Sequence, residues 1–297
     1  METEIDLTKR WVNQGTGEIR DDVEEIIDGG TRKKKHNQSR GYDYYKNNIL
    51  PLPTLLQQEY GNFIHSRYQA LLDKVNNDTA TAFRFIYLCT YMDYDTGYII
   101  WKNRKVKNDN LIDVFNVSKN TMTKIKNTLY EYELIKSDSD GYVFINTEYC
   151  YRGDINQNKL YKKQCTRIFN NSIQELYNKS NDSREHKLLG KFILLLPYIN
   201  VWHNVICLTP KEKDMGKIVF PNSSQMDQIL GVGSRNSNRT LNELFNITVG
   251  GEKAILMVTD TKSIKMYLVN PRIYYGGTNV EGLQETMEYF KARGGID

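Results

Sequence analysis

Side chains that could hydrogen-bond to the edges of DNA bases are concentrated in residues 116–135, NVSKNTMTKIKNTLYEYELI. Apolar Met122, Ile125 and Leu129 are three and four residues apart, which predicts an amphipathic helix with Ser118 as its N-cap. The polar residues expected on its outer surface are Lys119, Asn120, Thr121, Thr123, Lys124 and Asn127. Lysine donates to guanine acceptors and asparagine pairs with adenine, so this composition fits a reader of the major groove. A solvated helix surface is the competing interpretation.

A DNA-reading helix of this kind needs a short helix across a tight turn, and in winged proteins a β-hairpin follows it. Residues 111–115, LIDVF, supply the short helix, and residues 116–117 supply the turn. Residues 133–149 are predicted to form the hairpin, with Lys136 as a candidate contact to the DNA backbone. The hairpin tip, SDSDG, is acidic, and we interpret it as a tight turn formed by Asp and Gly.

A similar order of motifs recurs later in the chain. YVFINTEYCYRGD and MYLVNPRIYYGGT align with an offset of 124, which pairs Asn146 with Asn270. Further upstream, FIYLCTYMDY resembles FILLLPYINV, and each is followed by a predicted strand. Several matches in the same order predict a duplicated module.

The predicted reading helix also has a counterpart. SKNTMTKIKNTL and SRNSNRTLNELF align with an offset of 116, which pairs Ile125 with Leu241 and Leu129 with Phe245. The candidate readers of this second helix are Arg235, Asn236, Ser237, Asn238, Arg239 and Asn242. Its hairpin offers Lys262 and Lys265 for contacts to the DNA backbone.

The predicted fold is mainly α with small β wings (α+β), arranged as tandem winged helix-turn-helix domains. Residues 1–50 are expected to be a flexible charged arm, in which Arg32, Lys33, Lys34 and Lys35 either contact DNA or form a solvated charge run. The remaining predicted boundaries are a first winged-helix domain at 51–153, a basic linker helix at 154–183, a second domain at 184–278 and a C-terminal helix or tail at 279–297.

The first domain is predicted to open with one amphipathic helix. Its apolar stripe comprises Phe63, Ile64, Tyr68, Leu71, Leu72 and Val75. This stripe fits either a buried core or the surface of a homodimer.

Other classes of site lack their sequence signatures. Cys89, Cys150, Cys165 and Cys207 have neither zinc-knuckle nor CxxC spacing, and the four histidines are isolated from one another. No phosphate-binding loop or nucleophile elbow occurs. The longest apolar run, residues 192–198, is too short to span a bilayer, and no secretory signal is found. We therefore expect a cytoplasmic protein that is not an enzyme and uses neither metal nor cofactor.

Three stretches resemble a known family. GNFIHSRYQALLDKV, SKNTMTKIKNTLYEYELI and INTEYCYRGDINQNKLY resemble the RepL-type replication proteins of Firmicute plasmids and phages. That resemblance implies a winged-helix initiator, encoded by a plasmid or phage, that binds its own origin. In this sequence Asn146-Thr147 and Arg152-Gly153-Asp154 follow the family pattern, and Asn270-Pro271 follows it in part.

The expected partner is therefore double-stranded DNA, together with host replication or transcription machinery. A replication initiator that binds origin repeats is the first hypothesis. A phage-type transcriptional regulator would use the same geometry, and a winged-helix module that docks proteins is a third possibility.

Overall fold

The computed structural model describes residues 57, 60–94, 96–153, 165–180, 182–259, 265–275 and 280–293, together with the short strands β1 (Trp11–Val12) and β2 (Ile19–Arg20). The side chains at 166, 234–238, 280, 281 and 293 are outside this description. The chain divides into two compact units, Met1–Gln58 and Glu59–Asp297. In the first unit β1 pairs antiparallel with β2. The basic residues predicted in the arm, Arg32 to Lys35, lie outside the described residues.

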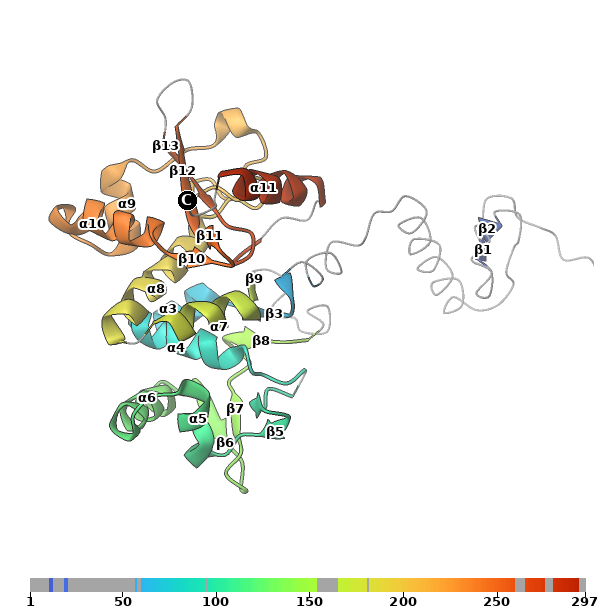
Figure 1. The fold of residues 1–297 in the computed structure, drawn as a ribbon, viewed down its shortest axis with the longest axis vertical. Helices are drawn as coiled ribbons and strands as arrows, with labels where there is room; N and C mark the ends of the chain where they lie inside the picture. Colours follow the sequence, from blue (N-terminus) through green and yellow to red (C-terminus); the bar gives the residue numbers. More distant parts are fainter. Residues whose placement is uncertain are drawn as a thin grey trace, which may run out of the picture. The chain divides into compact units, whose positions relative to one another are not determined.

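The second unit begins with a series of elements that includes the predicted reading helix, which lies at the edge of this part of the molecule (Figure 1). In chain order they are β3 (Phe63–Ser66), α3 (Tyr68–Lys74), α4 (Thr79–Cys89), β4 (Ile100–Trp101), β5 (Arg104–Lys105), η1 (Asn108–Asn110), α5 (Leu111–Phe115), α6 (Lys119–Glu131), β6 (Ile135–Ser137), β7 (Val143–Ile145) and β8 (Cys150–Tyr151). We call residues 60–153 the first half of this unit.

The second half, residues 165–293, follows a similar order. Its elements are β9 (Thr166–Phe169), α7 (Asn170–Lys179), α8 (Ser183–Leu195), η3 (Leu196–Tyr198), η4 (Met215–Lys217), α9 (Ser223–Leu230), α10 (Ser234–Phe245), β10 (Thr248–Val249), β11 (Glu252–Lys253), β12 (Ile255–Thr259), β13 (Lys265–Val269) and α11 (Val280–Arg293). Helices with small antiparallel sheets make this an α+β fold, which confirms the predicted class at that level. Among the described residues, no helix has the length and apolar character needed to cross a bilayer.

The predicted helix over residues 63–75 is wrong in its first part. Phe63 and Ile64 belong to strand β3, which is the middle strand of a sheet with the order β8-β3-β9. Phe63 pairs with Phe169 across more than a hundred residues, and this partner was not predictable from local spacing. Aromatic and β-branched residues also favour strands, so the apolar stripe suited either structure. Leu71 and Leu72 are buried in α3 as core residues.

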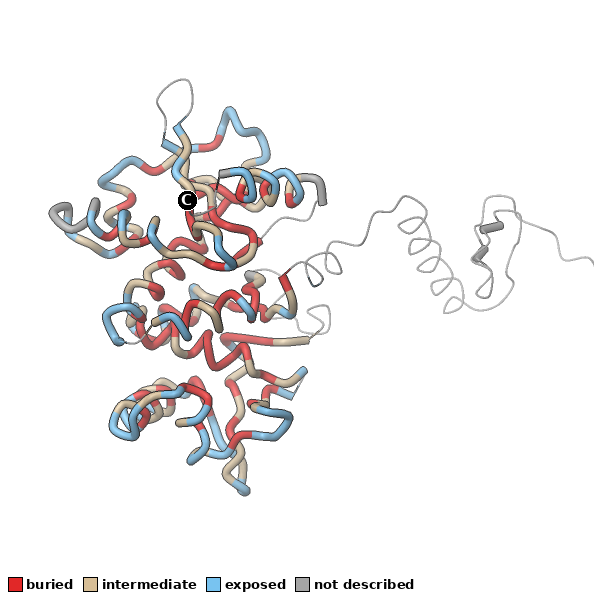
Figure 2. Tube along the Cα trace, in the orientation of Figure 1, coloured by how far each residue is buried: buried red, intermediate tan, exposed pale blue. Residues whose placement is uncertain are grey.

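The stretch expected as a basic linker helix contributes to the core. Residues 154–164 lie outside the described part, and the remainder forms β9 and α7. Tyr177 of α7 stacks on Tyr87 of α4 with ring centroids 3.6 Å apart, and on His186 of α8 at 4.7 Å. Figure 2 shows buried residues along these three helices, between the two halves. Residues 166–177 therefore help to join the halves into one core.

Helices α4 and α8 are in close contact at Gly190. A Cβ atom at this position would collide with the backbone carbonyl of Thr79. Thr79 also donates a hydrogen bond from its hydroxyl to the Lys187 carbonyl, at 3.2 Å. Each helix begins at an aspartate N-cap, Asp78 or Asp182, whose carboxylate accepts two backbone N–H groups.

Backbone hydrogen bonds recur in the two halves at constant offsets. Ile100 N donates to Tyr91 O, and Cys207 N donates to Tyr198 O, so both donor and acceptor are shifted by 107 residues. The isolated β-bridges Met92↔Ile99 and Ile199↔Ile206 have the same offset. The segment after α8 therefore folds back as the segment after α4 does.

The hairpins β6–β7 and β12–β13 close in the same way. Asn146 Nδ2 donates to Glu133 O at 3.0 Å, and Asn270 Nδ2 donates to Lys253 O at 3.0 Å. The Asn146 backbone N–H bonds to Leu134 O, and that of Asn270 bonds to Ala254 O. The predicted pairing of Asn146 with Asn270 thus describes two residues with the same structural role.

Candidate nucleic-acid interface

The turn before α6 has the geometry that the sequence predicted. Helix α5 ends at Asn116, which adopts the left-handed conformation (φ 49°, ψ 49°) that asparagine tolerates better than most residues. Ser118 is the N-cap of α6, and its hydroxyl accepts the Thr121 N–H at 3.3 Å. Only Val117 separates the cap of one helix from the cap of the next, so α5 and α6 are joined by a tight, fixed turn.

Helix α6 separates its apolar and polar residues as expected. Met122, Ile125 and Leu129 are buried on the inner side. The exposed candidate readers are Lys119, Asn120, Thr123, Lys124 and Asn127. No acidic residue occurs between residues 119 and 130, and neither Lys119 nor Lys124 forms an ion pair with any described residue. The outer surface of α6 is therefore basic and rich in amides.

Two threonines of α6 have local hydrogen-bond partners. Thr121 is half-buried, and its hydroxyl lies 2.9 Å from the Ser118 hydroxyl, so it belongs to the helix cap. Thr123 remains exposed, and its hydroxyl donates to Lys119 O at 3.0 Å. The side chains without a local partner in the described structure are thus the lysines and asparagines.

The second half repeats the turn, but the structure aligns α10 with α6 one residue differently from the sequence comparison. Helix α9 ends at Gly231 in the left-handed conformation (φ 60°, ψ 40°), and Gly233 is the N-cap of α10. These residues correspond to Asn116 and Ser118 with an offset of 115, not 116. Ser234 is therefore the first residue of its helix instead of the counterpart of Ser118.

Burial of side chains supports the corrected register. Thr240 and Leu244 are buried in α10, at the positions that correspond to Ile125 and Leu129. Leu241 and Phe245, which the sequence alignment placed there, are only partly buried. Large apolar residues favoured the alignment on Leu241 and Phe245, but the geometry of the preceding turn decides which side of the helix faces inward.

The two candidate reading helices, α6 and α10, differ in charge. Arg239 and Asn242 are exposed and match Lys124 and Asn127, whereas the side chains of Arg235, Asn236, Ser237 and Asn238 lie outside the described structure. The Arg239 guanidinium lies 3.5 Å from the Glu243 carboxylate, which is also 3.6 Å from Arg184. Exposed ion pairs of this kind are weak, yet they place negative charge beside the candidate reader.

The first hairpin has an acidic tip with its own hydrogen bonds. The Asp138 carboxylate accepts the N–H groups of Asp140 and Tyr142 and the hydroxyl of Tyr98. Partial desolvation opposes ionisation, but these hydrogen bonds and the nearby Lys105 hold the pKa of Asp138 below its usual value. The predicted tight turn is confirmed, and Lys136 on β6 is exposed.

The second hairpin is longer and more apolar. Strands β12 and β13 pair over five residues each, and Met257 is 50% exposed. Lys265 is exposed at the start of β13, whereas Lys262 lies outside the described residues.

A second basic element, which was not predicted from the sequence, lies near α6. The strand predicted after FIYLCTYMDY covers residues 96–101, but β4 continues through a two-residue turn into β5, and the two strands form a hairpin. Its exposed basic residues are Lys102, Arg104, Lys105 and Lys107. The available signal was the segment WKNRKVK, in which basic residues surround Asn103 between the strand-forming residues Trp101 and Val106.

Buried His65 and half-buried Cys165 form a pair of titratable side chains away from α6. Burial, followed by the charge of Arg167, lowers the pKa of His65 to about 4, and burial raises the pKa of the adjacent Cys165 thiol. Their Nδ1 and Sγ atoms are 3.9 Å apart. A neutral thiol beside a neutral imidazole is a poor nucleophile. Within the described ranges, no group of three His, Cys, Asp or Glu side chains could hold a metal ion.

Comparisons with known proteins add no relative: no family model, no curated protein and no solved structure matches the chain.

Proposed function

We propose that the protein binds double-stranded DNA in a sequence-specific manner through two winged helix-turn-helix modules. The observation that carries this proposal is the outer surface of α6. Lys119, Asn120, Lys124 and Asn127 are exposed on a helix that starts directly after a tight turn, and no acidic residue occurs between residues 119 and 130. Such a helix start is the part that reaches base edges in the major groove.

The second half supports a bipartite binding site. Helix α6 packs on α4 and α10 packs on α8, while α4 and α8 pack on one another. The spacing between the two reading helices is therefore set by a shared core. We infer that the DNA site has two half-sites with a strict separation.

The biological role that fits best is replication initiation at origin repeats of a plasmid or phage, with recruitment of host replication proteins. The resemblance of residues 61–75, 118–135 and 145–161 to RepL-type proteins supports this role. A transcriptional regulator would show the same DNA binding, so a replication assay separates the two. We expect a plasmid that carries the bound repeat to replicate only when the protein is supplied.

DNA reading is tested by titrating a duplex selected from a random pool, and a scrambled duplex, at fixed salt. Asn120→Ala or Lys124→Ala should cost about 1–3 kcal/mol of discrimination at particular base pairs. Lys126→Ala on the half-buried flank is the matched control and should weaken both duplexes alike. If the first two variants bind both duplexes like the parent, α6 does not read bases, and a protein-docking role is favoured.

The strict separation is tested with the same selected duplex. Inserting about five base pairs between the half-sites rotates one major groove by roughly half a turn. Affinity should then fall towards that of a single half-site. Unchanged affinity would show that only one module contacts DNA.

A further inference from the structure

The hairpin β4–β5 is a rigid projection from the first half. Its turn residues Lys102 and Asn103 both have positive φ (47° and 62°). This is the conformation of a type I′ turn, which connects the two strands of a hairpin through a two-residue loop. On either side of the hairpin, Ile99 N donates to Val143 O and Val143 N donates to Val106 O. The hairpin is therefore fastened at its base to strand β7.

Its charge is strongly one-sided. Residues 101–107 contain four basic residues, Lys102, Arg104, Lys105 and Lys107, and no acidic residue. All four are exposed, and in the described part of the chain none forms an ion pair. Two carboxylates lie nearby. Asp138 is within reach of the Lys105 charge, and its oxygens already accept the hydrogen bonds described above, while Asp113 lines the groove beside the hairpin without forming an ion pair with a described residue.

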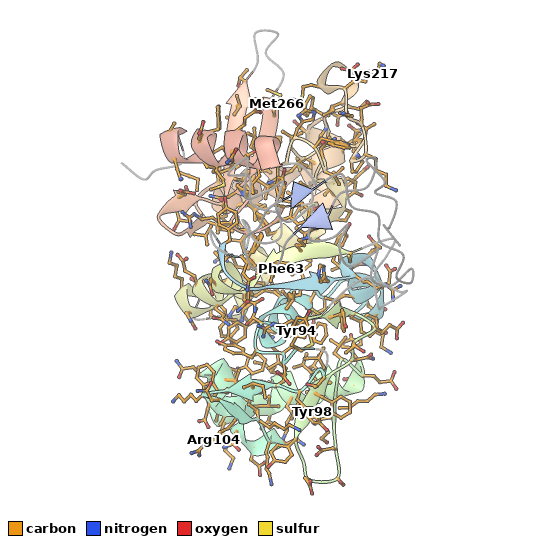
Figure 3. The ribbon with its side chains drawn as sticks, turned by 90° about the vertical axis from the view of Figure 1, so that its right-hand side faces the viewer. Phe63, Tyr94, Tyr98, Arg104, Lys217 and Met266 are labelled. Atoms are coloured by element: carbon orange, nitrogen blue, oxygen red, sulfur yellow. The ribbon has the colours of Figure 1, made fainter. Side chains whose placement is uncertain are left out.

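Aromatic rings hold these cations in place without neutralising them. The Lys105 ammonium lies 3.7 Å from the centre of the Tyr98 ring, and the Lys107 ammonium lies 5.0 Å from that of Tyr142. Trp101 packs edge-on against Tyr91, with centroids 5.2 Å apart, and so connects the hairpin to the core. A cation over a ring keeps its full charge, so the hairpin presents positioned positive groups. Figure 3 shows Arg104 at the outer edge of this part of the molecule.

A groove of about 810 Å³ lies between the hairpin and the turn that starts α6. One wall consists of Trp101, Lys102, Arg104, Lys105 and Val106, and the other includes Asn110, Asp113, Asn116 and Val117. The basic side chains of the β4–β5 hairpin thus line one side of a groove, and the turn that leads into α6 lines the other side.

We infer that the β4–β5 hairpin binds the phosphate backbone of the DNA that α6 reads. This inference rests on the proposed function and adds a contact that is independent of sequence. Exposed lysine and arginine residues without acidic partners are the groups that replace counterions along a phosphate backbone. Phosphate contacts fix the position of a protein on the duplex, and base contacts then specify the sequence.

The test compares two triple variants with equal change in net charge. In the first, Lys102→Asn, Arg104→Thr and Lys105→Thr remove the hairpin cations while retaining residues suited to the turn and strand. In the control, Lys187→Gln, Lys211→Gln and Lys291→Gln remove exposed cations from α8, from a turn and from α11. Thermal unfolding of both variants checks that the fold is retained.

Binding to the selected and the scrambled duplex is then measured from about 50 to 200 mM salt. We expect the hairpin variant to lose affinity for both duplexes by the same factor, on the order of tenfold. Its slope of log affinity against log salt should fall by about 0.9 for each phosphate that the variant no longer neutralises. The control variant should lose much less, and the ratio between the two duplexes should not change in either variant.

The outcomes separate this inference from the proposed function. If the parent shows no salt-dependent affinity for any duplex, the proposed function itself fails. If the parent binds DNA and Asn120→Ala loses discrimination, but the hairpin variant titrates like the parent, only the hairpin inference is overturned. If the control variant loses as much DNA affinity as the hairpin variant, the effect comes from net charge, and the hairpin inference is also overturned. Binding of polyglutamate through the hairpin, with DNA binding unchanged, would identify an acidic protein as the partner instead.

Discussion

The first and second halves of the larger unit share a set of backbone hydrogen bonds but differ in the chemistry of their surfaces. Asn146 and Asn270 close their hairpins with equivalent bonds, while Lys124 is followed one turn later by Thr128 and Arg239 by Glu243. These bonds satisfy polar groups that fix the hairpin bases, and the one at Asn270 is part-buried and costly to lose, whereas exposed side chains are free to change. A repeated fold therefore does not carry a repeated surface chemistry.

Insertions separate the halves further. The offset between corresponding residues rises from 115 at the helix caps to 124 at Asn146 and Asn270. Five of the extra residues form the small β10–β11 hairpin before Ala254, and four lengthen the β12–β13 hairpin. Both lie in surface connections, where added residues disturb few buried contacts.

The largest effect is expected from a buried charge in α10. Leu244 is fully buried, whereas Leu241 is only partly buried. Leu244→Asp should therefore cost about 4 kcal/mol or more in unfolding free energy, because an unpaired carboxylate is buried. Leu241→Asp serves as the comparison and should cost markedly less in a urea titration. The reverse order would restore the offset of 116 and break the proposed equivalence of the helices.

A smaller effect on stability is expected when His186 of α8 is protonated at acidic pH. Burial, and then the charge of Arg84, lowers the pKa of His186 to about 4, below the unfolded value of 6.5. The unfolded state therefore binds more protons between these pH values, and stability falls as pH drops from about 6.5 to 4. His186 and His65 should each contribute about 2–3 kcal/mol to this loss.

The variant His186→Phe tests the assignment through the pH dependence of unfolding. It should remove roughly half of the stability change between pH 6.5 and 4, leaving the part that His65 contributes. An unchanged pH profile would mean that His186 already titrates normally in the folded protein.

The next smaller effect on stability is expected at Asn146 and Asn270, the asparagines at the hairpin bases. In each hairpin the asparagine amide donates to a carbonyl earlier in the chain and accepts the N–H group two residues later. Asn146→Ala and Asn270→Ala each remove both hydrogen bonds, which should lower the free energy of unfolding by about 1–3 kcal/mol. Because Asn270 is fully buried and Asn146 is not, the second variant should lose more. Chemical denaturation of the two variants measures this difference, and equal losses would contradict the role assigned to burial.

The smallest effect concerns the exposed charges of the reading helices. Glu243→Thr makes α10 resemble α6 and should raise DNA affinity, while Thr128→Glu should lower it, each by about 0.3–1 kcal/mol. The paired variants are compared on the selected duplex at low salt. A change of the same sign in both would show that charge at this position does not distinguish the halves.

Several local features of this protein follow from its amino-acid sequence alone. The apolar spacing in residues 119–131 predicted α6, Ser118 was identified as its cap, and Asp138 to Gly141 were identified as a turn. These features depend on neighbours within a few residues, so local periodicity and capping chemistry were sufficient. The pairing of Asn146 with Asn270 was also predictable, because both residues stand in recognisable motifs.

Other features depend on how the chain is folded in three dimensions. Phe63 and Ile64 became a strand because β8 and β9 supply partners that are remote in sequence. The inner side of α10 carries Thr240 instead of Leu241, since the backbone conformation of Gly231 and Gly233 sets where the helix begins. The basic hairpin at Lys102 was hidden because a two-residue turn with positive φ at Lys and Asn has only a weak sequence signal. In each case a remote partner or a backbone dihedral, which residue spacing does not record, determined the outcome.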